Sequence, residues 1–119
     1  MKKTLVIGAS LNPSRYSNIA IHKLVLHDHE VKAIGLKIGK VAGVAITNKI
    51  HLYKDIDTIT LYINAKRQTA YYHYILSLNP ARVLFNPGTE NPEFYQQLKK
   101  HRIHYEEACT LVLLSTNQY

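Results

Sequence analysis

The chain has 119 residues, of which 15 are Lys or Arg and 8 are Asp or Glu, so its formal net charge is +7. This length predicts one domain, residues 1–119, that can bury a two-faced sheet but leaves no room for a separate catalytic domain. The positive charge favours anionic partners such as nucleotides, CoA or nucleic acid. The single cysteine, Cys109, excludes an internal disulfide, and no apolar run is long enough to span a bilayer. We therefore expect a cytoplasmic protein.

Short apolar runs alternate with helical patterns along the chain. Strands are expected at residues 4–7, 31–36, 58–63, 82–85 and 103–105. A first helix is expected from residue 19 to about residue 27, after a cap at Ser17 or Asn18. A second is expected over residues 65–78, a third from Pro92 with Asn91 as its cap, and a fourth near residues 110–114. The connector 37–57 reads as a loop with a short strand or extended arm and no full crossover helix.

This alternation predicts the α/β class. We expect a Rossmann-like, doubly wound, mainly parallel sheet of five strands with helices on both faces. A sheet of this kind binds ligands at the carboxyl ends of its strands. The strand ends are therefore where candidate site residues are sought.

The end of the first strand is the most informative part of the sequence. Gly8 permits a sharp turn, and Ala9 and Ser10 are small enough for phosphate oxygens to approach backbone N–H groups. Arg15 and Ser17 add a cation and a hydroxyl to the same loop. Only the first glycine of the G-x-G-x-x-G pattern is present, so a plain turn between a strand and a helix is the alternative interpretation.

Cations and small polar residues follow other strands as well. The second strand ends at Lys37, the third is followed by residues 64–67 and the fourth by residues 86–90. Enzymes that bind NAD in this fold usually carry an acidic residue at the end of the second strand, for the ribose 2′-hydroxyl. Lys37 instead suits the ribose phosphate of NADP or CoA, so NAD is the less favoured dinucleotide.

The chain resembles the small stand-alone CoA-binding proteins, which are similar to the N-terminal CoA-binding domain of the succinyl-CoA synthetase alpha subunit. The resemblance rests on residues 6–10 and 13–17, on Gly39-Lys-Val-Ala-Gly43, on Phe85-Asn-Pro-Gly-Thr89 and on Glu107-Ala-Cys109. It implies a Rossmann-like CoA-binding fold with the CoA phosphates near the first loop. The ligand-binding residues that it implies are Gly8, Ala9, Ser10, Arg15, Ser17, Asn64, Asn86, Pro87 and Gly88.

The chain departs from that family in two respects. The second strand of the family commonly ends in Val-Asn-Pro, where this chain has Gly35-Leu36-Lys37. The phosphorylated histidine of the synthetase lies in a separate domain that this short chain does not contain, so ligase activity does not carry over.

Other residues have a structural interpretation beside a functional one. The histidines in residues 27–30 and 101–106 form no recognised metal-ligand set, and we expect no metal site. Cys109 is expected to be a small buried side chain and not a nucleophile, because no His-Asp relay is identifiable. Tyr71, Tyr72 and Tyr74 are expected to divide between the core and a subunit contact, although stacking on adenine or RNA bases is the alternative.

Three functions remain open on the sequence. The first is a CoA or acyl-CoA binding module without chemistry of its own, acting as a carrier, sensor or partner of another protein. The second is an NADP-binding, reductase-like protein, for which no proton donor can be assigned. The third is a nucleic-acid-binding basic protein, which is disfavoured because the Lys and Arg residues are dispersed and no aromatic RNA-binding signature is present. The apolar stretch 41–46 predicts a homo-oligomer, most simply a homodimer.

Overall fold

One mixed β-sheet organises the computed structural model, which describes residues 1–119. Its seven strands lie in the order β3-β4-β2-β1-β5-β6-β7, and all neighbouring strands are parallel except the antiparallel pair β3 and β4. In chain order the strands are β1 (Thr4–Ala9), β2 (Val31–Gly35), β3 (Gly39–Val41), β4 (Val44–Thr47), β5 (Thr58–Leu61), β6 (Arg82–Phe85) and β7 (His104–Glu107). The carboxyl ends of the parallel strands therefore meet at one edge of the sheet.

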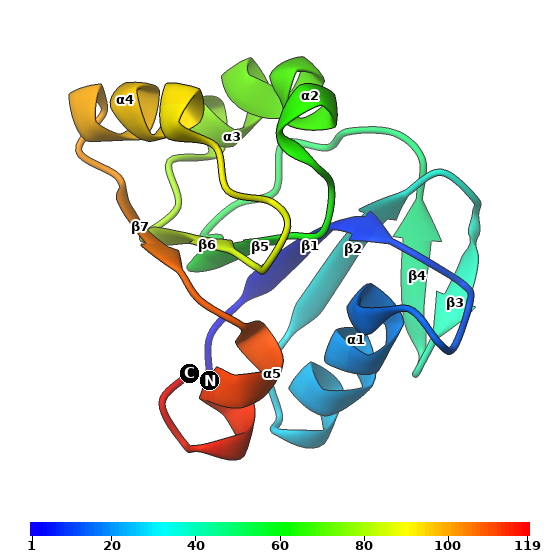
Figure 1. Ribbon diagram of the computed structural model, residues 1–119. Coiled ribbons are helices and arrows are strands. Elements are labelled where there is room, and N and C mark those ends of the chain that lie inside the picture. The colour runs from blue at the N-terminus through cyan, green and yellow to red at the C-terminus, as the bar shows by residue number, and fades with distance from the viewer.

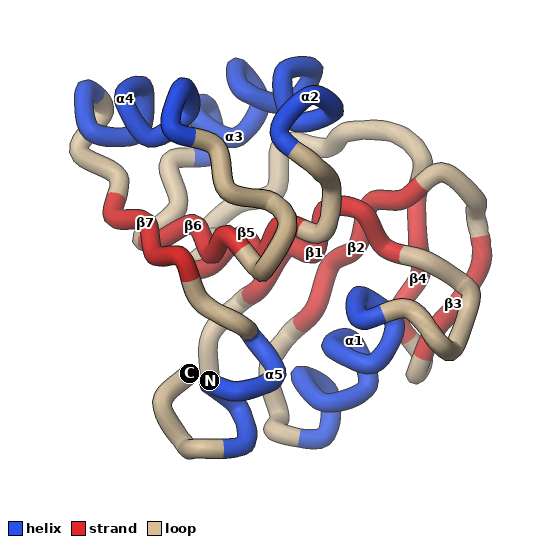
Figure 2. The backbone as a smooth tube through the Cα atoms, in the orientation of Figure 1, coloured by secondary structure: helices blue, strands red, loops and turns tan.

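Helices cover both faces of this sheet, as Figures 1 and 2 show. The helices α2 (Ala65–Gln68), α3 (Tyr72–Leu78) and α4 (Pro92–Lys100) lie on one face, with a 3-10 turn at Thr69–Tyr71 between α2 and α3. The helices α1 (Tyr16–Leu26) and α5 (Thr110–Ser115) lie on the other face. None of these helices has the length and apolar character needed to cross a membrane.

The strand count differs from the expected five because the connector 37–57 forms two strands. Val41 pairs with Val44 across a two-residue turn, in which Ala42 and Gly43 both have positive φ angles of 51° and 79°. That is the geometry of a tight hairpin turn whose twist matches that of the flanking strands. The second strand of this hairpin, β4, then joins β2 in parallel. The absence of a crossover helix in the connector is confirmed, but the strand count was wrong.

Two apolar cores lie on the two faces of the sheet. The larger one, under α3 and α4, includes the fully buried Phe85 and Phe94. The smaller one, under α1 and α5, includes Val41 and Ile46, which are 5% and 1% exposed. These two hairpin residues are thus covered within a single chain, whereas Leu36, Ile38, Ile50 and Leu52 on either side of the hairpin are exposed. The homo-oligomer stays a prediction.

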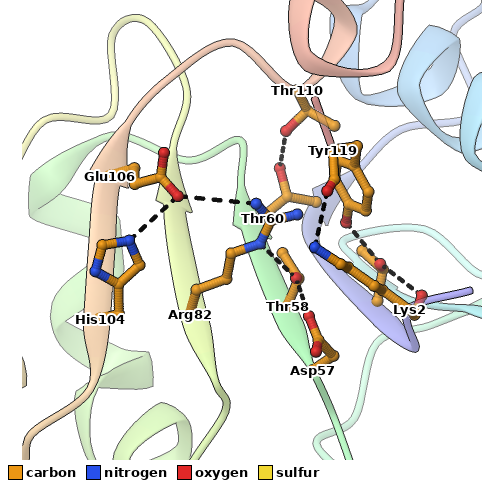
Figure 3. A network of polar contacts seen from close by, with 10 residues as sticks. Lys2, Asp57, Thr58, Thr60, Arg82, His104, Glu106, Thr110 and Tyr119 are labelled. Atoms are coloured by element: carbon orange, nitrogen blue, oxygen red, sulfur yellow. Dashed lines mark hydrogen bonds and ion pairs between the residues drawn. The ribbon is translucent and has the colours of Figure 1, made fainter. Parts of the chain in front are cut away.

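A polar network crosses the sheet on the side of α5, near the amino ends of the strands (Figure 3). Arg82 on β6 donates from Nε to the Thr58 hydroxyl at 2.8 Å and lies 3.8 Å from a carboxylate oxygen of Glu106. Its guanidinium sits 4.5 Å from the ring centre of Tyr119, whose hydroxyl is 2.6 Å from that of Thr4. The network ties the last residue of the chain to the three strands β1, β5 and β6.

This network predicts a measurable loss of stability when Arg82 is removed. The Arg82 side chain is only 11% exposed, so Arg82→Ala removes a largely buried donor to the Thr58 hydroxyl and the guanidinium that lies over the ring of Tyr119. We expect the free energy of unfolding to fall by about 1–3 kcal/mol, measured by urea denaturation. Lys99→Ala, on the exposed end of α4, is the matched control and should change stability far less. Equal stabilities of the two variants would contradict this account.

Candidate functional site

A cavity of about 460 Å³ opens at the carboxyl ends of β1, β2, β5 and β6. It lies at the strand ends where a sheet of this topology receives its ligands. Nine of the ten residues that the sequence analysis selects line this one cavity: Gly8, Ala9, Ser10, Arg15, Ser17, Lys37, Asn64, Pro87 and Gly88. Residues from four separate loops are thereby brought together.

The turn after β1 is shaped by the close approach of two neighbouring strand ends. Gly8 has a φ angle of +96°, and a Cβ atom there would lie 2.9 Å from the backbone of Tyr62 and 2.8 Å from the side chain of Ile63. A Cβ atom on Gly35, at the end of β2, would lie 2.2 Å from the carbonyl oxygen of Ala9. Both glycines are therefore required by the packing of the chain itself, which is a stronger reason than the phosphate approach expected for Gly8.

Three residues that line the cavity have backbone N–H groups without a protein partner. No backbone or side-chain acceptor receives a hydrogen bond from the amides of Ser10, Tyr16 or Ser17. The last two belong to the first turn of α1, whose cap residue Arg15 makes no side-chain capping bond and which has no acidic residue in that turn. Unpaired amides at the start of an eleven-residue helix, together with the helix dipole, favour an anion.

The start of α1 differs slightly from the expected one. Ser17 and Asn18 were expected as caps, but the helix begins at Tyr16 and both residues lie buried in its first turn. Asn18 instead donates from its amide to the carbonyl oxygen of Ser10 at 2.9 Å. The hydroxyl oxygen of Ser10 accepts from the backbone N–H of Asn12 at 3.1 Å. These bonds hold the loop between β1 and α1 in one shape.

The charge of the cavity is uniformly positive. Arg15, Lys37 and Arg67 line it, and no Asp or Glu does. The three cations take part in none of the ion pairs of the structure, which all involve residues elsewhere. A cavity with three unpaired cations attracts a ligand that carries several negative charges.

Asn86 is the one selected residue that does not line the cavity. Its side chain is 2% exposed, and its amide donates to the hydroxyl of Thr60 and to the carbonyl of Leu61 at 2.7 and 2.9 Å. Its carbonyl oxygen accepts from the backbone N–H of Thr110 at 2.8 Å. Asn86 therefore joins β5, β6 and the start of α5 and supports the loop that carries Pro87 and Gly88.

Several cavity residues were not selected from the sequence. They are Leu11, Asn12, Tyr16, Gly35, Leu36, Tyr62, Ile63, Arg67, Tyr71 and Thr89. Arg67 lies in the segment 64–67 that was noted for its cations, so the signal for it was present. The apolar pair Leu11 and Leu36 gave no signal, because an exposed leucine in a loop is common in any protein.

Tyr62 lines the cavity, but its hydroxyl is not available as a base. Burial raises the pKa of Tyr62 to about 12. The hydroxyl is buried without a hydrogen-bond partner and lies towards Thr60 and Thr110, on the α5 side of the sheet. It therefore stays protonated at neutral pH.

Comparison with known proteins decides the family. The family model of the CoA binding domain matches residues 2–115. The chain belongs to this family. No protein with a curated function matches it.

Solved structures agree with this CoA binding domain along its whole length. A crystal structure described as an uncharacterized protein shares 45% identity at a TM-score of 0.97, over 100% of this chain and 98% of its own. A conserved hypothetical protein from Pyrococcus furiosus shares 25% identity at a TM-score of 0.83, with 94% and 98% covered. A Thermus thermophilus protein, cell-free ID.343, shares 20% identity at a TM-score of 0.86, over 99% of this chain and 91% of its own. At this identity the likeness supports the fold and nothing further.

Of the remaining candidate residues of this CoA binding domain, only Tyr71 lies at the cavity. No group of three metal-ligating side chains comes together anywhere in the structure. Cys109 is half-buried and precedes α5. Tyr74 is buried in the larger core and Tyr72 stacks on Phe94 at 4.3 Å, whereas Tyr71 lines the cavity.

The two glycines with positive φ in the cavity wall allow a matched test of the strand-end packing. Gly8→Ala and Gly88→Ala both place a side chain in a left-handed conformation, which costs about 1–2 kcal/mol. Only Gly8→Ala also pushes a Cβ atom into the backbone of Tyr62, since nothing lies within 4 Å of the Cβ position on Gly88. We expect thermal unfolding to show a clearly larger loss of stability for Gly8→Ala. Similar melting temperatures would show that β5 moves aside freely.

Proposed function

We propose that the protein binds CoA or acyl-CoA in this cavity. The observation that carries the proposal is the charge of the cavity at the ends of β1 and β2: Arg15 and Lys37 are unpaired there, and no carboxylate lines the cavity. CoA carries a diphosphate and a ribose phosphate, and membership of the CoA binding domain family agrees with it. NADP, which has the same number of phosphate groups, is the competing ligand.

The first loop suits the diphosphate. The amides of Ser10, Tyr16 and Ser17 lack protein partners, and Arg15 stands beside them at the start of α1. Charge-assisted hydrogen bonds from an arginine and from backbone N–H groups are the strongest that a phosphate receives from a protein. This end of α1 is therefore proposed to hold the centre of the ligand.

The β2 side of the cavity suits the adenosine. Leu11 and Leu36 provide apolar surface for the faces of an adenine ring, and Lys37 follows Leu36 directly. Lys37 is then proposed to pair with the ribose phosphate. The pantetheine arm would lead away across the loops that follow β5 and β6, where Asn64, Thr89 and Tyr71 offer polar groups.

Arg15→Ala tests the diphosphate site. Loss of a charge-assisted contact costs about 1.5–3 kcal/mol, so CoA affinity should fall by about tenfold to more than a hundredfold in calorimetry. The fold should persist, because Arg15 is exposed and its side chain caps nothing. The control is Lys23→Ala, which removes an exposed cation from the last turn of the same helix. This variant should bind CoA as the unmodified protein does. An unchanged affinity of folded Arg15→Ala would reject the proposal for this loop.

Lys37→Glu tests the ribose phosphate site and separates the rival nucleotides. We expect the affinity order CoA, NADP, NAD for the unmodified protein at one fixed ionic strength. Lys37→Glu should weaken CoA and NADP, and should affect dephospho-CoA less than CoA, because only the ribose phosphate faces the reversed charge. Lys40→Glu, on the exposed side of β3, controls for the change in net charge. Tighter binding of NAD than of CoA would refute the CoA-binding function.

A further inference from the structure

Arg67 is the one cation of the cavity that the phosphates of CoA do not account for. Arg15 and Lys37 stand beside the proposed diphosphate and ribose phosphate sites, whereas Arg67 follows β5. No carboxylate of the protein pairs with it, and the cavity lining contains none. The exposed, unpaired guanidinium of Arg67 is therefore available to a further anionic group of the ligand.

The turn that carries Arg67 is held rigidly although its side chain is exposed. The Asn64 side chain accepts a hydrogen bond from the backbone N–H of Arg67 at 3.0 Å. The next residue, Gln68, is fully buried and donates to the carbonyl oxygens of Ile63 and Thr89 at 2.9 and 2.7 Å. The side-chain oxygen Oε1 of Gln68 accepts from the side-chain amide of Asn91 at 2.9 Å. The position of Arg67 is thus fixed against the loop that forms the opposite wall of the cavity.

The strand order determines which end of the ligand reaches this turn. β1 lies between β2 on one side and β5 and β6 on the other. A ligand with its diphosphate over the end of β1 and its adenosine over the end of β2 extends its remaining part over the ends of β5 and β6. In CoA that part is the pantetheine arm, which ends in the thiol or the acyl thioester. Arg67 therefore lies on the acyl side of the site.

We propose that Arg67 selects acyl-CoA molecules whose acyl group ends in a carboxylate. The proposal rests on the CoA-binding function proposed above. A guanidinium binds a carboxylate through two parallel hydrogen bonds, a geometry that a neutral alkyl end cannot supply. An uncharged acyl group would leave Arg67 with water and gain nothing from it. The ligand class is then the CoA thioesters of dicarboxylic acids.

Calorimetry with matched thioesters tests this inference. The pairs are malonyl-CoA with propionyl-CoA and glutaryl-CoA with pentanoyl-CoA, which differ within each pair only by a carboxylate in place of a methyl group. At one ionic strength we expect the acidic member of at least one pair to bind about tenfold more tightly or better. Arg67→Gln should remove that preference and leave the affinity for free CoA unchanged. Lys66→Gln, the exposed neighbour that does not line the cavity, should keep it.

Each contrary outcome has a distinct meaning. Equal affinities within both pairs, or a preference that survives in Arg67→Gln, would overturn the role of Arg67 while CoA binding stands. An Arg67→Gln variant that weakens free CoA as much as every thioester would also overturn it, because Arg67 would then hold a phosphate. Failure of free CoA to bind the unmodified protein would instead refute the proposed function itself.

Discussion

The close approach of three strand ends is the constraint on which the cavity depends. At the end of β1 the chain has no room for a side chain, because the end of β5 lies against Gly8 and the carbonyl of Ala9 lies against Gly35 of β2. The chain consequently leaves the sheet with a left-handed residue and turns into α1. The amides at the start of α1 have no partner in the protein, because the first N–H groups of a helix lack intrahelical acceptors. A packing requirement within the protein thus fixes where the chain leaves the sheet towards the anion site proposed above.

The opposite wall of the cavity has a different origin. Buried amide side chains connect the loops that follow β5 and β6: Gln68 bonds to both loops, and Asn91 bonds to Gln68 and to the hydroxyl of Tyr72. Such fully satisfied polar networks rigidify the backbone around them. Asn86 acts in the same way one layer deeper. The exposed residues of the cavity are therefore mounted on a scaffold that does not need to reorganise when a ligand binds, which lowers the entropic cost of binding.

The three cations of the cavity are exposed and form no ion pair in the free protein. A multiply charged ligand that pairs with them stabilises the folded chain by mass action, so ligand binding and folding stability are coupled. Tyr62 stays neutral because burial raises its pKa to about 12. The cavity is thus lined by cations and neutral groups, which suits the anionic ligand proposed above.

Local sequence patterns determined the alternation of strands and helices, the turn at Gly8, and the small and cationic residues at the strand ends, because these depend on neighbouring residues and on apolar periodicity. The cap at Asn91 with Pro92 at the first helical position is another such local feature, and the structure confirms it. Only the tertiary structure decided that residues 39–47 pair as a hairpin beside β2. It also decided that Asn86 is buried while Arg67 and Tyr71 line the cavity, and that the backbone of Tyr62, just after β5, leaves no room for a side chain at position 8. These outcomes depend on which strands become neighbours, and contacts between residues far apart in the chain leave no pattern in either segment taken alone.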